Sequence, residues 1–385
     1  MFFFVYLDFN DLKIPKMKKW PTVTVIIPCY NASSTIVQCV ESVKNLSYQS
    51  KPEIIVVNDA STDGSLQLLK KMKGIKIIDK TKNAGKAAAI NSALRVAKGE
   101  LVCCIDADTF PSTDALEKTV PFFSDKKVGA VTCLIRVHEP DNFFKVVQEL
   151  EYLVGFAFYQ TMLSQIGAAM ITPGPMCVYR KKALQDVGGY DETNITEDME
   201  IALRLQKNFY KIKASYLAVV FTVVPTTLRQ WVKQRIRWYR GKVFNTAKYR
   251  ELLFNPSYGF LGNFSLPFTF LIEMSSVFIL FLIGVLFLQS ALFGLNVFLS
   301  GLNVNFVVPL EFPPLVIHSS AVFFSVVTFS TFGLALFAAF GIAKEKFGLK
   351  YVLPVIFIVF FYGLLVASMW LTSLFKEINR SEYSW

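Results

Sequence analysis

The chain has 385 residues, of which 53% are hydrophobic and 37 are phenylalanine, and its formal net charge is +11. This length exceeds one ordinary domain and this apolar content exceeds that of soluble proteins, so we expect an enzyme domain joined to a membrane part. The positive charge favours membrane lipid headgroups or phosphorylated substrates as partners. Nucleic acid is not expected, because no basic aromatic platform or recognition helix is apparent.

Residues 1–20 begin with seven apolar residues and continue with several lysines and Trp20. Seven apolar residues are too few to cross a bilayer, which takes about 20. No basic stretch precedes them, as it would in a signal peptide. We expect a segment that lies on the membrane surface, with a frayed start as the alternative.

Apolar strands and helices alternate between residues 22 and 106. The predicted strands are 22–27, 53–57, 75–78 and 101–105, and the predicted helices are 34–43, a segment ending near Met72, and 86–97. Nearly continuous apolar strands alternating with helices indicate a parallel sheet covered on both faces, which is an α/β, Rossmann-like fold. Ligands of such sheets bind at the carboxyl ends of the strands. Because neither G-x-G-x-x-G nor G-x-x-x-x-G-K-[ST] occurs, a dinucleotide dehydrogenase and a P-loop ATPase are not favoured.

Asp106 and Asp108 follow the fourth predicted strand directly. Residues i and i+2 of an extended segment point the same way, so the two carboxylates would repel each other without a cation. Mg²⁺ and Mn²⁺ bind carboxylate and phosphate oxygens together, so we expect a divalent metal here that would neutralise a diphosphate leaving group. The alternative is a solvated loop. Zinc is not expected, because the six cysteines form no C-x-x-C and only two histidines occur, which favours free thiols.

Two later segments are predicted to be helices, and each carries polar residues that could take part in catalysis or binding. Thr196 is suited to cap a helix over 197–207, and Asp198 then lies in its first turn, where the helix dipole favours an ionised carboxylate. Such a base could take a proton from a hydroxyl, although Glu197 and Asp198 could also simply stabilise the helix start. Gln234, Arg237 and Trp238 share one helical face, where Arg suits phosphate and Trp suits a sugar ring; an amphipathic membrane-surface helix is the alternative.

Three apolar stretches are long enough to span a bilayer, at about 264–288, 319–343 and 351–374. The loop at 344–350 carries three lysines, whereas 289–314 carries no Lys or Arg, so the positive-inside rule places the former in the cytoplasm. We therefore expect a multi-pass protein of the cell membrane with residues 1–255 cytoplasmic and the tail from Lys376 outside. Glu273 lies inside the first stretch and is either functional or just outside the true span.

The motifs together resemble those of family 2 glycosyltransferases, in the membrane-bound branch that includes hyaluronan, chitin, cellulose and poly-N-acetylglucosamine synthases and ceramide glucosyltransferase. The matching segments are Pro28-Cys29-Tyr30-Asn31, Asn58 to Asp63, Asn83-Ala84-Gly85-Lys86, Asp106-Ala107-Asp108, Thr196-Glu197-Asp198 and Gln234 to Trp238. The resemblance covers about residues 21–245 and implies a GT-A type cytoplasmic domain there. The interfacial segment and the three membrane helices would occupy 246–385.

The resemblance implies a role for each matched residue. The donor, with UDP as the implied nucleotide, would be held by Pro28, Tyr30, Asp59, Lys86, Asp106, Gln234, Arg237 and Trp238. Asp108, with Asp106, would bind Mn²⁺ or Mg²⁺, and Asp198, with Glu197, would be the catalytic pair in an inverting transfer. Trp238 and Gly174 would contact the acceptor, although the prolines on both sides of Gly174 are not typical of the family.

The sequence leaves several functions open. Processive polysaccharide synthesis is favoured over transfer of a single hexose or N-acetylhexosamine to a lipid or polyprenyl phosphate. A membrane transporter with a nucleotide-sensing domain and a membrane-anchored nucleotidyltransferase are the alternatives from other classes. The polymer synthases usually have spans before the catalytic domain, whereas this chain has only the Phe-rich start, so a complete translocation channel would require a homo-oligomer.

Overall fold

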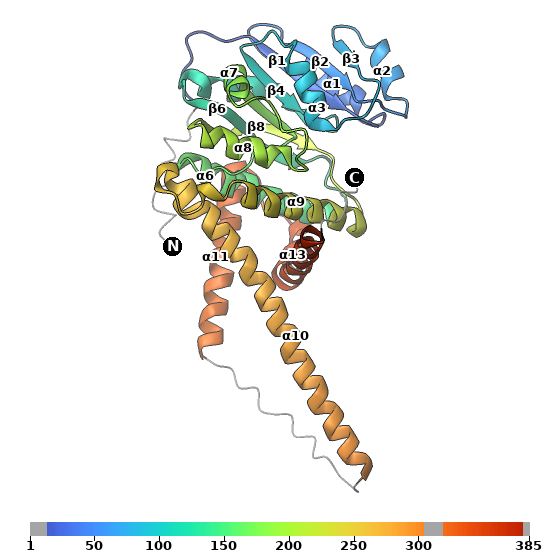
Figure 1. The fold of residues 1–385 in the computed structure, drawn as a ribbon, viewed down its shortest axis with the longest axis vertical. Coiled ribbons are helices and arrows are strands. Elements are labelled where there is room, and N and C mark those ends of the chain that lie inside the picture. Colours follow the sequence, from blue (N-terminus) through green and yellow to red (C-terminus); the bar gives the residue numbers. More distant parts are fainter. Residues whose placement is uncertain (1–13, 304–318, 380–385) are drawn as a thin grey trace.

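A mixed sheet forms one end of the molecule and long helices extend from it at the other (Figure 1). The structure is a computed structural model, and it describes residues 14–303 and 319–379. Within these residues one eight-stranded sheet has the order β3-β2-β1-β4-β7-β6-β8-β5. Its strands are β1 (Val23–Cys29), β2 (Glu53–Asn58), β3 (Lys76–Asp79), β4 (Leu101–Ile105), β5 (Thr109–Pro111), β6 (Val128–Val137), β7 (Met176–Arg180) and β8 (Lys211–Thr222).

The first four strands confirm the predicted parallel sheet. β1 pairs in parallel with both β2 and β4, and β2 pairs in parallel with β3. β7 then joins β4 and β6 in antiparallel pairing, so the complete sheet is mixed. Four helices lie within a few residues of their predicted positions: α1 (Ile36–Lys44), α2 (Ser65–Lys71), α3 (Lys86–Leu94) and α8 (Glu197–Lys207). The short helices α4 (Ala115–Thr119) and α7 (Lys181–Asp186) were not predicted.

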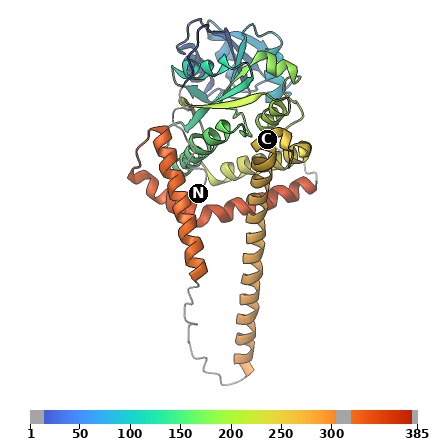
Figure 2. The same cartoon turned by 90° about the vertical axis from the view of Figure 1, so that its left-hand side faces the viewer.

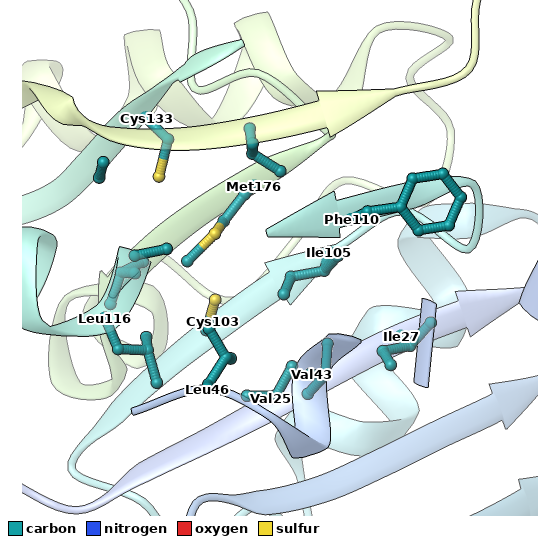
Figure 3. Packing of buried hydrophobic residues seen from close by; sticks show 14 of the residues in the cluster. Val25, Ile27, Val43, Leu46, Cys103, Ile105, Phe110, Leu116, Cys133 and Met176 are labelled. Atoms are coloured by element: carbon teal, nitrogen blue, oxygen red, sulfur yellow. The ribbon is translucent and has the colours of Figure 1, made fainter. Parts of the chain in front are cut away.

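Alternation along β1 explains why both faces of the sheet are covered. Val25 and Ile27 point into one hydrophobic cluster, together with Cys103 and Ile105 of β4 (Figure 3). Ile26, between them, belongs to the cluster on the opposite face. Because side chains of a strand alternate between its faces, a continuous apolar run supplies both cores. The six cysteines are free and buried, as predicted.

A second group of helices connects the sheet to the apolar helices. They are α5 (Phe143–Tyr152), a π-helical segment (Leu153–Gln160), α6 (Thr161–Gln165) and α9 (Leu228–Lys248). Since α9 continues to Lys248, the predicted domain boundary at 245 cuts through a helix. The predicted surface segment 1–20 lies mostly outside the described residues, but Trp20 packs edge-on against Tyr48 of the sheet domain, with ring centroids 5.5 Å apart.

Three helical regions are long and apolar enough to cross a membrane, by length and composition: Leu261–Leu295, Val326–Ala343 and Leu349–Ile378. The first lies largely within α10 (Leu266–Asn303), which extends beyond the predicted end at residue 288. The loop predicted to lie on the external side of the membrane includes residues 304–318, which are not among the described residues. The second lies within α11 (Ser319–Ala343). The third comprises α12 (Val352–Phe357), a π segment and α13 (Gly363–Ile378). In Figure 2, α10 and α11 run down the view, whereas α13 runs across it beneath the sheet domain.

Candidate active site

Side chains from β4, α3 and α8 converge at the carboxyl edge of the parallel strands. The Lys86 ammonium lies 2.5 Å from Asp106 Oδ1 and 3.0 Å from Glu197 Oε1, so it bridges two acidic residues that are 91 positions apart in the chain. Lys86 starts α3 and Glu197 starts α8. Asp106, predicted to bind the donor, and Glu197, from the predicted catalytic pair, therefore meet around the Lys86 ammonium group.

The segment around Gly174 closes one side of this cluster. A methyl group at Gly174 would lie 2.4 Å from Lys86 Nζ and 2.6 Å from Asp106 Oδ2, so any side chain at this position would have to displace the Lys86–Asp106 pair. Thr172 donates two hydrogen bonds to the Asp198 carbonyl oxygen, from its amide and from its hydroxyl. The prediction that Gly174 contacts the acceptor stays a prediction, and the geometry places this glycine directly beside Lys86 and Asp106.

Glu197 and Asp198 have pKa values shifted in opposite directions. Burial alone would raise the pKa of Glu197, but Lys86 and Arg237 outweigh it and the pKa is lowered. Burial, reinforced by the neighbouring Glu197 charge, raises the pKa of Asp198 to about 6. Two adjacent carboxyls thus separate into a permanent anion held by Lys86 and a base that titrates near neutrality, which is the arrangement that general-base chemistry uses. Arg237 acts on both pKa values, so it lies within electrostatic reach of this pair.

Asp108 lies close enough to Asp106 for the two carboxylates to repel each other, and the charge of Lys86 offsets this repulsion only in part. No Lys, Arg or His among the described residues forms an ion pair with it, and burial together with Asp106 raises its pKa to about 6. A divalent cation would relieve this repulsion, and carboxylate oxygens are the ligands that Mg²⁺ and Mn²⁺ prefer. Within the described ranges no three His, Cys, Asp or Glu side chains could hold a metal ion by themselves. Asp106 and Asp108 therefore fit a metal whose remaining ligands are substrate oxygens and water.

Asp59 is buried at the end of β2 and organises the loop before α3. Its carboxylate accepts hydrogen bonds from Lys80 Nζ at 2.5 Å and from the Gly85 amide at 2.8 Å. Tyr30, which follows β1 directly, is 51% exposed. Ala60 adopts φ +57°, a left-handed conformation that turns the chain sharply after Asp59. The contact of Lys80 with Asp59 was not predicted, because Lys80 belongs to none of the sequence motifs.

Helix α9 brings the Gln-x-x-Arg-Trp motif to the site, and one buried arginine orients two of its members. Arg235, only 3% exposed in its side chain, donates to Gln234 Oε1 at 2.7 Å, and its guanidinium carbon lies 4.1 Å from the centroid of the Trp238 ring. In the sequence Arg235 lies inside the Gln234 to Trp238 segment, and the motif assigns it no role. The structure instead places it beneath the predicted donor and acceptor residues as their support.

Glu151 at the end of α5 holds that arginine in place. Its carboxylate accepts from Arg235 Nη2 at 2.8 Å and from Trp231 Nε1 at 3.3 Å. The Tyr362 hydroxyl, from the third apolar region, also donates to Glu151. A buried charge paired in this way is costly to leave unpaired, so Glu151 fixes α9 relative to both α5 and the apolar helices. Nothing in the local sequence around Glu151 distinguishes it from a surface residue.

The other half of α9 packs against the start of α8. Thr196 occupies the predicted cap position, but its side chain makes no capping bond and instead accepts from Asn245 Nδ2 at 2.9 Å, which corrects the capping prediction. Asn194 and Asn245 form a further buried amide pair at 2.7 Å. A methyl group at Gly241 would lie 2.1 Å from Thr196 Oγ1. A glycine inside an otherwise regular helix was the one sequence signal available for this close approach.

Glu273 pairs with Lys242 of α9. This ion pair links the first apolar helix to α9, and Glu273 lies within the apolar region Leu261–Leu295 rather than outside it. Whether Glu273 also has a functional role stays a prediction.

Known glycosyltransferases are similar to this chain in sequence. Residues 24–188 match the family model described as glycosyl transferase family 2. The poly-beta-1,6-N-acetyl-D-glucosamine synthase of Staphylococcus aureus is 34% identical over 223 residues, which is 57% of this chain and 54% of that protein. The synthase of the same name from Staphylococcus epidermidis is 33% identical over 246 residues, covering 62% of this chain and 60% of that one. The chain therefore spans little more than half the length of these relatives.

One solved structure shares most of the architecture. The mannosyltransferase PcManGT from Pyrobaculum calidifontis, in complex with GDP-Man and Mn²⁺, superposes with a TM-score of 0.63 over 96% of this chain and 90% of its own, at 22% identity. At this identity the likeness shows a common fold, and it confirms the predicted α/β domain followed by apolar helices.

Proposed function

We propose that the chain transfers a sugar from a nucleotide sugar to an acceptor at the membrane, because residues 24–188 match the family model described as glycosyl transferase family 2. The observation that carries this proposal is the convergence of Asp106, Lys86, Glu197 and Asp198 at the carboxyl edge of the sheet. We infer UDP-N-acetylglucosamine as the donor and a growing polysaccharide as the acceptor, since the relatives at 34% and 33% identity carry the name of a poly-N-acetylglucosamine synthase.

The position of Asp198 beside the acidic cluster supports a one-step displacement at the anomeric carbon of the donor sugar. Asp198 accepts the proton of the acceptor hydroxyl while the hydroxyl oxygen forms a bond to the anomeric carbon. The bond from that carbon to the diphosphate oxygen breaks on the opposite face, which inverts the configuration and releases the nucleoside diphosphate. Asp108 and Asp106 would hold a divalent metal, which would supply charge neutralisation to the leaving diphosphate.

The other groups hold the reactants. Lys86 and Arg237 place two positive charges beside the acidic cluster, where they bind phosphate oxygens and keep Glu197 ionised. Trp238, supported by Arg235, offers a flat apolar ring to a sugar of the acceptor. Glu197 is bound to Lys86, so it positions that lysine and leaves proton transfer to Asp198.

We propose that the sheet domain faces the cytoplasm. The lysine-rich loop 344–350 returns to this domain, because Arg136 of β6 pairs with Glu345 at 2.8 Å. The loop and the domain therefore share one side of the membrane, and the lysines assign that side to the cytoplasm.

The test is a panel of nucleotide sugars incubated with the protein in detergent and Mn²⁺ or Mg²⁺. We expect release of nucleoside diphosphate, a polymeric product, and loss of about 10²–10⁴-fold in rate for Asp198→Asn. One added sugar would assign single transfer to a lipid acceptor instead. Pyrophosphate release would indicate a nucleotidyltransferase, and transport unaffected by Asp198→Asn would indicate a transporter with a nucleotide sensor.

A further inference from the structure

The third apolar region, Leu349–Ile378, has the composition of a membrane span but is placed differently from the other two. Its most apolar window has a mean hydropathy of 2.5, equal to that of the first region. In Figure 2 its α13 portion runs across the direction of α10, directly beneath the sheet domain. By length and composition this region could therefore cross the bilayer. Whether it does so depends on how it packs against the rest of the protein.

The N-terminal half of this region contacts α5. The rings of Phe357 and Phe143, at the start of α5, lie 5.5 Å apart. Tyr362 donates to Glu151 at the other end of α5 and packs on Trp231 of α9, with ring centroids 5.8 Å apart.

The C-terminal half contacts α9. Trp370 stacks on Tyr239 with centroids 4.9 Å apart, and the Ser373 hydroxyl donates to the Ile236 carbonyl at 3.3 Å. At the end of the helix, Glu377 pairs with Arg240 at 3.2 Å. Contacts with the sheet domain and its helices thus continue from residue 357 to residue 377.

A crossing helix could not keep all of these contacts. Twenty residues of helix extend about 30 Å, which is the thickness of the hydrocarbon core. If Phe357 lay at one membrane surface and Glu377 at the other, one of them would be about 30 Å away from α5 and α9. Both ends instead touch helices that pack on the same domain.

The face turned away from the domain is apolar and exposed. Its largest exposed side chains are Leu353, Phe360, Phe361, Leu364, Leu371, Phe375 and Ile378. Lys350 and Lys376 flank the region, at positions where ammonium groups reach lipid headgroups. α10 and α11 also expose large apolar side chains, among them Phe281, Phe287 and Phe337, so we expect lipid to be the common partner of all three regions.

We propose that residues 349–378 lie within the membrane interface beneath the sheet domain, with their outer face in the headgroup and acyl boundary, and do not cross. Within residues 14–303 and 319–379 the chain then crosses the bilayer twice, through α10 and α11, and Asn379 lies on the same side as the sheet domain. This replaces the prediction of an outside tail. The proposal concerns only which parts of the chain share one side of the membrane, and it does not depend on the proposed transferase activity.

Cysteine labelling tests the proposal in the full chain. The native cysteines are all buried, so an introduced exposed thiol is the selective target of a membrane-impermeant maleimide. Asn379→Cys is compared in sealed vesicles with Lys51→Cys, on the sheet domain, and Asn303→Cys, at the end of α10 beyond the first apolar region. We expect Asn379→Cys to react from the same side as Lys51→Cys, whereas reaction from the side of Asn303→Cys would overturn the proposal.

A depth measurement gives a second reading should labelling at residue 379 be blocked. Phe360→Trp is placed in vesicles whose lipids carry bromine either near the ester groups or at the chain ends. The emission change against the parent protein isolates the new indole. Quenching mainly by the ester-side bromines supports an interfacial helix, and stronger quenching by the chain-end bromines contradicts it.

Discussion

The close approach of α9 to α8 can be tested with a single methyl group. In Gly241→Ala, the new Cβ would meet Thr196 Oγ1 at 2.1 Å and Thr196 Cγ2 at 2.3 Å. Ordinary contact begins at 3.4 Å, so the two helices must separate by roughly 1 Å or distort locally. Overpacking of this kind costs about 1–3 kcal/mol.

The separation would also move the active site. Thr196 precedes Glu197 and Asp198, and Gly241 lies one turn after Arg237 and Trp238, so the proposed catalytic pair would shift relative to the residues on α9. A misplacement of about 1 Å can cost ~10²-fold in rate. We therefore expect Gly241→Ala to lower both Tm and kcat.

The assay pairs thermal unfolding in detergent with nucleoside diphosphate release. The matched control is Gly284→Ala, another glycine in the interior of a long helix, where an added Cβ meets nothing within 4 Å. It should unfold and turn over like the parent protein. If Gly241→Ala also kept the parent Tm and kcat, the reasoning about the α8–α9 contact would be refuted.

Three further predictions concern the charged groups. Because burial raises the pKa of both Asp108 and Asp198 to about 6, kcat/KM should fall as pH drops below about 6, with a logarithmic slope above one; a profile flat to pH 5 would contradict both assignments. Asp108→Asn should abolish the rise in Tm that Mn²⁺ and donor together produce, yet leave the metal-free Tm at pH 7 equal or higher. This is because a carboxylate whose pKa is raised in the folded state loses stability as pH rises through that value. Arg235→Lys keeps the charge but loses the planar stack on Trp238, so we expect a weaker near-UV circular dichroism band and a raised acceptor KM, with an unchanged band as the refuting result.

The cluster around Arg235 explains how the membrane helices and the active site constrain each other. Arg235 supports Gln234 and Trp238, Glu151 holds Arg235, and Tyr362 holds Glu151. A change in the position of the third apolar region would therefore reach the acceptor side of the site through three consecutive contacts.

The sequence alone determined the parallel half of the sheet and the order of the motifs along it. Buried parallel strands need apolar side chains on both faces, so β1, β2 and β4 could be recognised from local composition, and strand ends locate the ligand edge. The boundaries of β4 and α8 were predicted to the residue, because polar turn and helix-start residues flank them directly.

Tertiary structure decided what those residues contact. The Lys86 bridge, the Asn245 bond to Thr196 and the burial of Arg235 join positions far apart in the chain, and no local pattern encodes such pairings. The path of the third apolar region was decided in the same way. Hydropathy measures how much apolar surface a helix has, whereas its direction depends on which neighbours bury that surface, and here α5 and α9 hold both of its ends.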